Sequence, residues 1–292
     1  MALPAHRVPE LEQLRPLLWG LAYRMTGAAE EADDVVQDAL LRAWERPPGR
    51  VDEPLRAWLV AVTLNLGRDR LRARKRRAYV GPWLPSPVPD ARLVDEQIAD
   101  RQSASWAFLC AAERLSATQR AVFLAREVLE LSAAETGAAL GCSPAAVDTA
   151  LHRARAALVD LPAAPTMLDD GVIVAFLTCL QLGMTRAAIK LLHPDAVALN
   201  DGGGLVNAAR MPVVGARKIV VFFKRLARLY PRGVGVRLVR CNGALTLVGE
   251  VPAGQRDNNL PSAFTLCATV EGGRITRLYS VLAPPKLAVV LG

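Results

Sequence analysis

Apolar side chains recur at helical spacing in the first quarter of the chain. The groups are Leu11, Leu14, Leu18, Leu21 and Met25; then, after Gly27, Val35, Val36, Ala39, Leu40 and Ala43; then, after Pro47-Pro48-Gly49, Leu55, Trp58, Leu59, Val62 and Leu66. Apolar residues three and four positions apart lie on one face of an α-helix. The pattern predicts a three-helix unit over roughly residues 11–77.

The segment that follows this unit reads AYVGPWLPSPVPD, from Ala78 to Asp90, with prolines at positions 82, 85, 87 and 89. Proline lacks a backbone N–H and fixes φ, so this spacing excludes a helix and favours an extended chain. We predict a linker here, with helices again over residues 95–160.

Helix start signals are clear in this second helical region. Ser116 with Gln119, and Ser132 with Glu135, both have the spacing of a capping box. Gly141 then supplies a turn, followed by Ser143 and Pro144 as helix cap and first helical residue. These signals predict two short helices, residues 133–140 and 144–159, arranged as a helix-turn-helix.

The last part of the chain mixes helical and strand-like patterns. Helices are predicted near residues 171–182, 185–192 and 215–229, and strands at residues 195–200, 234–241, 244–251, 262–270 and 274–282. Early helices with late strands indicate a small α+β domain. The predicted fold is therefore multidomain, with two all-α domains followed by an α+β domain.

Composition narrows the class of protein further. The 292 residues are 52% apolar, yet no apolar run reaches the roughly 20 residues that span a bilayer. We expect a cytoplasmic protein without a membrane partner. The cysteines show no CxxC pair and no histidine at ligand spacing, so we expect reduced thiols, no metal site and no cofactor; they are Cys110, Cys142, Cys179, Cys241 and Cys267.

The second helix of the predicted helix-turn-helix has an apolar and a polar face. Val147, Leu151, Ala154 and Leu158 are predicted to face inward, and the candidate DNA-facing residues are Ser143, Ala145, Asp148, Thr149, His152, Arg153 and Arg155. A recognition helix reads base edges and contacts phosphates with such side chains. The alternative is a structural helical hairpin. Asp148 would repel phosphate unless it accepts a bond from a cytosine amine.

A basic run ends the third predicted helix, and it comprises Arg68, Arg70, Arg72, Arg74, Lys75, Arg76 and Arg77. Cations on such a surface can follow a DNA backbone without reading its sequence. A solvated helix end stabilised by the helix dipole has the same pattern. The residues alone leave both interpretations open.

Three segments resemble one family in the same order. EEADDVVQDALLRAW, residues 30–44, resembles the polymerase-binding helix of extracytoplasmic-function (ECF) sigma factors; RAWLVAVTLNLGRDRLRARKRR, residues 56–77, resembles their −10-reading segment; and residues 113–158 resemble their −35-reading domain. The resemblance implies an ECF sigma factor that directs RNA polymerase to promoters. Its partners would be the β′ clamp of the polymerase core and promoter DNA.

The resemblance also assigns roles to residues. Those implied to face the polymerase are Asp34, Val35, Gln37, Asp38 and Arg42; those implied to contact −10 DNA are Asn65, Arg68, Asp69, Arg72, Arg74, Lys75 and Arg76. In this family the loop between the two helices holds a base extruded from the DNA stack. In this chain that loop corresponds to residues 46–54. That loop contains no aromatic residue.

The tail resembles the ECF subgroup with a fused C-terminal SnoaL-like (NTF2-like) domain that modulates the factor. The matching motifs are YVGPWLP at 79–85, DGGG at 201–204 and PPKL at 284–287, which imply interdomain regulatory roles for Trp83, Asp201, Gly202, Gly203, Gly204 and Lys286. Leu205 and Ala283-Pro284-Pro285 depart from the subgroup pattern. The implied domains are sigma-2 over 8–77, a Pro-rich linker over 78–105, sigma-4 over 106–161 and the SnoaL-like domain over 166–292.

Charge divides unevenly between the two parts of the chain. Residues 1–160 hold 21 Lys and Arg against 21 Asp and Glu, whereas residues 161–292 hold 15 against 7. A basic C-terminal domain is attracted by acidic surfaces, so one hypothesis is autoinhibition through the acidic residues at 30–38. The competing hypothesis is contact between this domain and upstream DNA.

Other function classes were weighed against the sigma factor. One is a helix-turn-helix transcription regulator with a ligand-sensing NTF2-like domain, and a small ligand in the C-terminal domain fits either class. The other is a cyclase-like enzyme, whose polar candidates would be His193, Asp195, Asp201 and Tyr230. No spacing makes those residues converge, so we expect no catalysis. The sequence leaves the oligomeric state open.

Overall fold

A computed structural model describes residues 7–45, 54–76, 79–93, 102–159, 167–229, 233–255 and 260–292. The chain forms two compact units. The first contains Met1–Ala78, Leu93–Ala104 and Phe108–Leu161; the second contains Tyr79–Arg92, Ser105–Ala107 and Pro162–Gly292. The first part of the predicted linker thus belongs to the C-terminal unit, and linker residues 94–101 lie outside the described residues.

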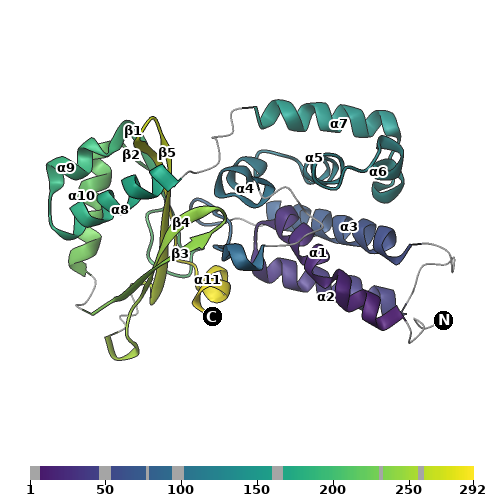
Figure 1. Cartoon of the computed structure of the whole chain (residues 1–292), viewed down its shortest axis with the longest axis horizontal. Coiled ribbons are helices and arrows are strands. Elements are labelled where there is room, and N and C mark those ends of the chain that lie inside the picture. The colour runs from purple at the N-terminus through teal and green to yellow at the C-terminus, as the bar shows by residue number, and fades with distance from the viewer. Residues whose placement is uncertain are drawn as a thin grey trace. The chain divides into compact units, whose positions relative to one another are not determined.

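Three helices begin the first unit, as the apolar pattern predicts (Figure 1): α1 (Val8–Thr26), α2 (Ala29–Glu45) and α3 (Leu55–Lys75). Helix α1 ends at Gly27, whose φ of 69° is left-handed and whose N–H donates to the Tyr23 carbonyl at 2.6 Å. A Cβ at Gly67 of α3 would lie 2.9 Å from the Met25 side chain. The glycine therefore allows α1 and α3 to approach closely.

Shorter helices complete the first unit. They are η3 (Gln102–Ala104), α4 (Trp106–Ala112), most of which belongs to this unit, α5 (Ala117–Phe123), the π-helical turn η4 (Leu124–Val128), α6 (Ala133–Leu140) and α7 (Pro144–Ala157). Both predicted capping boxes are present, at Ser116 and at Ser132. The turn between α6 and α7 has Gly141 at φ 69° and the Ser143 side chain accepting the Ala146 N–H. The predicted helix-turn-helix is therefore confirmed.

A six-stranded sheet forms the centre of the second unit. Its strands are β1 (Leu192–Asp201), β2 (Val213–Val214), β3 (Gly235–Cys241), β4 (Ala244–Glu250), β5 (Ala263–Glu271) and β6 (Arg274–Val281), in the order β2-β1-β6-β5-β4-β3. All neighbours are antiparallel except β1 and β6. The hairpin turns Asn242-Gly243 and Gly272-Gly273 have positive φ, as two-residue hairpins with the right twist require.

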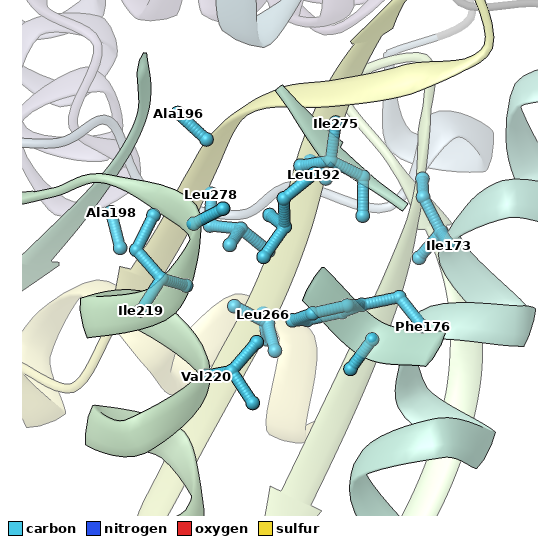
Figure 2. Packing of buried hydrophobic residues seen from close by; sticks show 13 residues of the cluster. Ile173, Phe176, Leu192, Ala196, Ala198, Ile219, Val220, Leu266, Ile275 and Leu278 are labelled. Atoms are coloured by element: carbon cyan, nitrogen blue, oxygen red, sulfur yellow. The ribbon is translucent and has the colours of Figure 1, made fainter. Parts of the chain in front are cut away.

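Helices α8 (Met167–Gln181), α9 (Thr185–Lys190) and α10 (Ala216–Leu229) cover one face of this sheet. Figure 2 shows Phe176 of α8 and Ile219 and Val220 of α10 directed at sheet residues such as Leu266. All four side chains are buried. The predicted α+β domain is thereby confirmed.

Two elements of this unit were not predicted from the sequence. Strand β2 has only two residues, and helix α11 (Pro284–Leu291) follows β6 directly. Helix α11 lies on the side of the sheet away from α8 and α10 (Figure 1). Short 3-10 turns, η2 (Asp90–Arg92) and η5 (Ala253–Gln255), complete the unit. Among the described residues, no helix is both long and apolar enough to cross a membrane.

Two helical glycines give opposite predictions for stability. A Cβ at Gly137 of α6 would lie 2.6 Å from the Cys142 carbonyl oxygen, whereas a Cβ at Gly171 of α8 would meet nothing within 4 Å. We expect Gly137→Ala to destabilise the first unit by about 1–3 kcal/mol, because the helix-turn-helix backbone must shift. Gly171→Ala should stabilise the second unit by about 0.5–1 kcal/mol. Calorimetric unfolding of both variants checks this, and equal effects would contradict it.

Candidate nucleic-acid interface

The outer face of α7 is free for a partner. Val147, Leu151, Ala154 and Leu158 are buried, while all seven candidate side chains are exposed, namely Ser143, Ala145, Asp148, Thr149, His152, Arg153 and Arg155. Arg155 pairs with Glu127 at 2.6 Å. The other exposed side chains lie on one side of α7. The major groove of DNA is wide enough to admit an α-helix, whose exposed side then contacts the bases.

Two grooves lie beside this face. The first, about 550 Å³, has α7 residues including Thr149 and Arg153 on one side and Ser116 and Thr118 on the other. The second, about 560 Å³, is lined by the same Ser116 and Thr118 together with Arg72, Lys75 and Arg76 of the α3 end. The two grooves thus share one wall, and cations line both of them.

The exposed face of α2 holds most of the residues predicted to bind polymerase. Asp34, Gln37, Asp38 and Arg42 are at least partly exposed. The implied role of Val35 needs correction, because its side chain does not face the surface but is fully buried in the three-helix core. A core side chain cannot face a partner, so Val35 supports the surface only by packing.

Sequence reasoning missed two residues on this face. Leu41 and Trp44 are about half exposed, at 52% and 50%. They lie three and six positions after Asp38, so they continue the same exposed stripe of α2. Leu41 falls outside the apolar spacing of this helix, which was a usable signal, whereas Trp44 follows Leu40 by four positions and spacing alone could not identify it.

Side chains of α3 also neutralise the acidic part of α2. Arg70 bonds to Asp34 at 3.2 Å and to Asp38 at 3.0 Å. Arg74 bonds to Glu31 at 3.3 Å. The acidic residues at 30–38 are therefore less available to a basic partner than the sequence suggested.

Two of the residues predicted to contact −10 DNA, Asn65 and Arg68, bond to the end of α6. The Asn65 side-chain amide donates to the Ala139 carbonyl at 2.7 Å, and the Arg68 guanidinium donates to the Leu140 carbonyl at 3.1 Å. Arg68 also bonds to Asn65 at 2.6 Å. These acceptors are the last carbonyls of α6, which a helix leaves unsatisfied and which carry the negative end of its dipole.

The end of α3 makes further bonds to α5 and to the turn before it. Arg72 donates to the Thr118 hydroxyl at 3.4 Å and Lys75 to the Leu115 carbonyl at 2.7 Å. Asp69 pairs with Arg72 at 3.4 Å, and Arg76 is exposed. Arg77 and loop residues 46–53 lie outside the described residues.

A buried charge cluster anchors this packing. Glu113 accepts bonds from Arg74 and Arg120, each at 2.8 Å. Arg120 is 1% exposed and its Nε donates to the Arg24 carbonyl. Burial lowers the pKa of Arg120, and the Glu113 carboxylate opposes that shift. Arginine starts from so high a pKa that it stays charged, so the cluster needs Glu113 as its counter-ion.

The second unit binds the proline-rich segment through Asp201. This carboxylate is fully buried and accepts bonds from the Tyr79 hydroxyl at 2.6 Å, the Leu84 N–H at 2.8 Å and the Lys286 ammonium at 2.6 Å. Lys286 also donates to the Leu84 carbonyl and lies 4.2 Å from the centre of the Trp83 ring. Asp201 thus joins the segment to α11 despite the sequence departures at Leu205 and Ala283-Pro284-Pro285.

The adjacent glycines allow this contact. Gly203 and Gly204 have φ of 61° and 76°. A Cβ at Gly203 would lie 3.3 Å from the Tyr79 hydroxyl, and one at Gly204 would lie 3.1 Å from Val80. Gly202 is equally confined, with the Val206 carbonyl oxygen 2.8 Å from a Cβ. Side chains here would push the proline-rich segment away.

The same segment is held again nine residues beyond Tyr79. Val88 and Asn242 exchange two bonds, at 2.9 and 3.0 Å, and Pro89 forms a bridge with Cys241. Asp90 accepts the Gly243 N–H at 2.9 Å. Residues 79–90 of the predicted linker are therefore bound to the C-terminal domain. The extended geometry was predicted and the resemblance implied interdomain roles for Asp201 and Lys286, whereas the bonds to Asn242 and Gly243 were not predicted.

The polar residues considered for catalysis do not converge. His193 and Asp195 are exposed at the start of β1, whereas Asp201 is buried at its end, about 20–26 Å away along the strand. Tyr230 lies outside the described residues. Within the described ranges, no group of three His, Cys, Asp or Glu could hold a metal.

Comparisons with known proteins identify the family of the chain. Residues 11–77 match Sigma-70 region 2, and residues 105–158 match Sigma-70, region 4. The ECF RNA polymerase sigma factor SigJ of Mycobacterium tuberculosis is 32% identical, with 96% of this chain and 92% of SigJ covered. Probable ECF sigma factor SigI of the same organism is 26% identical over 94% of this chain and 92% of its own.

A solved structure gives the same result over nearly the whole chain. The crystal structure of M. tuberculosis SigJ matches with a TM-score of 0.76 and 31% identity, covering 97% of this chain and 98% of that one. Two sigma domains in this order define a transcription initiation factor that takes RNA polymerase to promoters. The chain belongs to the ECF sigma factors, as the resemblance implied, and a C-terminal α+β domain follows its two sigma regions.

The Asp201 site gives a prediction on stability. Lys286→Met leaves a buried carboxylate without its counter-ion, so we expect the second unit to lose about 3–5 kcal/mol. Asp201→Asn combined with Lys286→Met should lose less than the sum of the two single changes. Denaturant unfolding measures these losses, and Lys190→Met, at an exposed position, is the control.

The alkylation rate of Cys241 shows whether Lys286→Met releases the proline-rich segment. Burial raises the pKa of its thiol to about 12, and its neighbours Pro89 and Asp90 belong to the proline-rich segment. Release of the segment in Lys286→Met should speed alkylation of Cys241 at pH 8 but not of Cys267, which is buried within the sheet. Mass spectrometry reads both rates. Unchanged protection of Cys241 would show that Asp201 does not hold the segment.

Proposed function

We propose that the exposed stripe of α2 binds the clamp of the polymerase core. Its two apolar side chains, Leu41 and Trp44, supply the buried contact area, and its polar residues Asp34, Gln37 and Arg42 give specificity at the edge. A half-exposed tryptophan beside a leucine on a charged helix is the observation that carries this assignment. Such aromatic residues provide much of the affinity of protein interfaces.

The proposed DNA contacts divide between two helices. The exposed face of α7 would read the −35 region through residues such as Thr149, His152 and Arg153. The basic end of α3 would contact the −10 region through Asn65, Arg68 and Arg72. Since Asn65 and Arg68 bond to α6 carbonyls, DNA can reach them only after α3 and α6 separate.

The C-terminal domain would regulate the factor through the proline-rich segment. That segment connects the end of α3 to the sigma-4 domain, and Asp201 and Asn242 bind it at two places. While it is bound, the segment cannot extend freely. We infer that its release sets how far apart the −10-reading and −35-reading domains can move.

The same contact contains a candidate site for a small ligand. A cavity of about 210 Å³ is lined by Val80 and Gly81 of the segment and by residues 202–210 that follow β1. Asn200, 2% exposed, also lines it, and its amide nitrogen has no hydrogen-bond partner. A ligand with an acceptor oxygen would satisfy that amide, and its binding would stabilise the bound form of the segment.

The polymerase assignment is tested by replacing Trp44. We expect Trp44→Ala to weaken binding to core polymerase roughly 30-fold, about 2 kcal/mol, because an interface aromatic is lost. Binding of the variant to promoter DNA without polymerase should be unchanged. Val159→Ala, which removes an exposed apolar group elsewhere in the first unit, is the control.

Fluorescence anisotropy with labelled core polymerase measures this binding. Wild-type affinity in Trp44→Ala would overturn the assignment of α2, and a loss in both variants would show a general effect of surface apolar groups. Loss of DNA binding alone would instead favour a regulator that acts without polymerase contact through α2.

A further inference from the structure

The strongest unassigned surface of the molecule is the outer face of α10. This helix carries five cations and no acidic residue, namely Arg217, Lys218, Lys224, Arg225 and Arg228. It holds a third of the Lys and Arg found in residues 161–292, which number 15. The surface therefore concentrates the positive charge of the C-terminal domain on one element.

The cations lie on one side because the opposite side is packed. Ile219 and Val220 are fully buried against the sheet (Figure 2). Arg217, Lys224 and Arg228 are seven and four residues apart, which places them on the same side of a helix, along about 16 Å. The sheet thus holds the row of cations in a fixed orientation.

Within the described ranges, most of these cations lack a carboxylate partner. Lys224 donates to the Thr185 hydroxyl at 2.7 Å. Arg217, Lys218, Arg225 and Arg228 are exposed, and no carboxylate among the described residues pairs with them. The arginines on β3 differ, since Arg237 and Arg240 pair with Glu250 and Asp170.

This arrangement lowers the stability of the helix itself. Arg217 and Lys218 occupy the first turn, where the positive end of the helix dipole disfavours cations. Lys224 and Arg228 are like charges four residues apart, which repel by a few tenths of a kcal/mol. A face selected only for solvation would alternate charges of both signs. An external polyanion removes these unfavourable terms.

We propose that the outer face of α10 binds the phosphate backbone of duplex DNA without reading its sequence. A row of guanidinium groups matches closely spaced phosphates, and binding releases the counterions condensed on the duplex. The acidic part of α2 suits this face less well, because Arg70 and Arg74 already bind Asp34, Asp38 and Glu31. The C-terminal domain thereby adds a DNA contact to those of the two sigma domains.

The test compares two double variants of the full chain with equal loss of charge. Arg225→Gln with Arg228→Gln removes two cations of the α10 face. Arg274→Gln with Arg277→Gln removes two exposed arginines of β6. Binding to duplex DNA without a promoter is measured from 50 to 300 mM salt, and thermal unfolding confirms that each variant folds.

We expect the α10 variant to bind about tenfold more weakly at 50 mM salt, with a slope of log K against log salt reduced by about 2. The β6 variant should keep the wild-type slope. Equal slopes for wild type and the α10 variant would overturn the proposal, as would an equal reduction in both variants, which would indicate net charge alone. Unchanged DNA binding with weaker binding to core polymerase would assign the face to an acidic protein surface instead.

Discussion

The bonds from α3 to the end of α6 constrain everything else in the first unit. Asn65 and Arg68 satisfy the last carbonyls of α6 at 2.7 and 3.1 Å. By family resemblance the same two side chains are expected to contact −10 DNA. An N–H that donates to an α6 carbonyl is not available to a nucleic acid at the same time. We therefore propose that packing of the helix-turn-helix on α3 and reading of DNA by α3 exclude each other.

Other contacts also hold α3 against the helices of the sigma-4 domain, so separating them costs free energy. The Arg74–Glu113–Arg120 cluster and the bond from Lys75 to the Leu115 carbonyl join the same elements. If opening costs about 2.7 kcal/mol, only about one molecule in a hundred is open, and apparent DNA affinity falls a hundredfold. The exposed stripe of α2 and the outer face of α7 need no opening. In the proposed function, polymerase docks on α2 first and its binding energy offsets the opening of α3.

The sequence predicted elements well and partners poorly, for a physical reason. Apolar spacing, capping boxes and the Gly141 turn are local signals, and they correctly predicted α1, α2, α3, α6 and α7. The basic run on α3 was ambiguous because periodicity gives the face of a helix but not what lies against it. Arg70 and Arg74 bind acids 36 and 43 residues earlier, and Asn65 binds a carbonyl 74 residues later. Tyr79 likewise binds Asp201 across 122 residues. Helix α11 was missed because a proline pair normally suggests a loop, although proline also suits a first helical turn.

The central claim is that α3 cannot pack on the helix-turn-helix and read DNA at the same time. The distance between α3 and α7 tests it most directly. Spin labels at Ala57 and Ala156, both exposed, would report this distance by double electron–electron resonance. The partly exposed cysteines are replaced beforehand so that only these two positions are labelled. The account predicts one short distance for the free protein and a longer one in the complex with core polymerase and promoter DNA. The same short distance in the transcribing complex would contradict it.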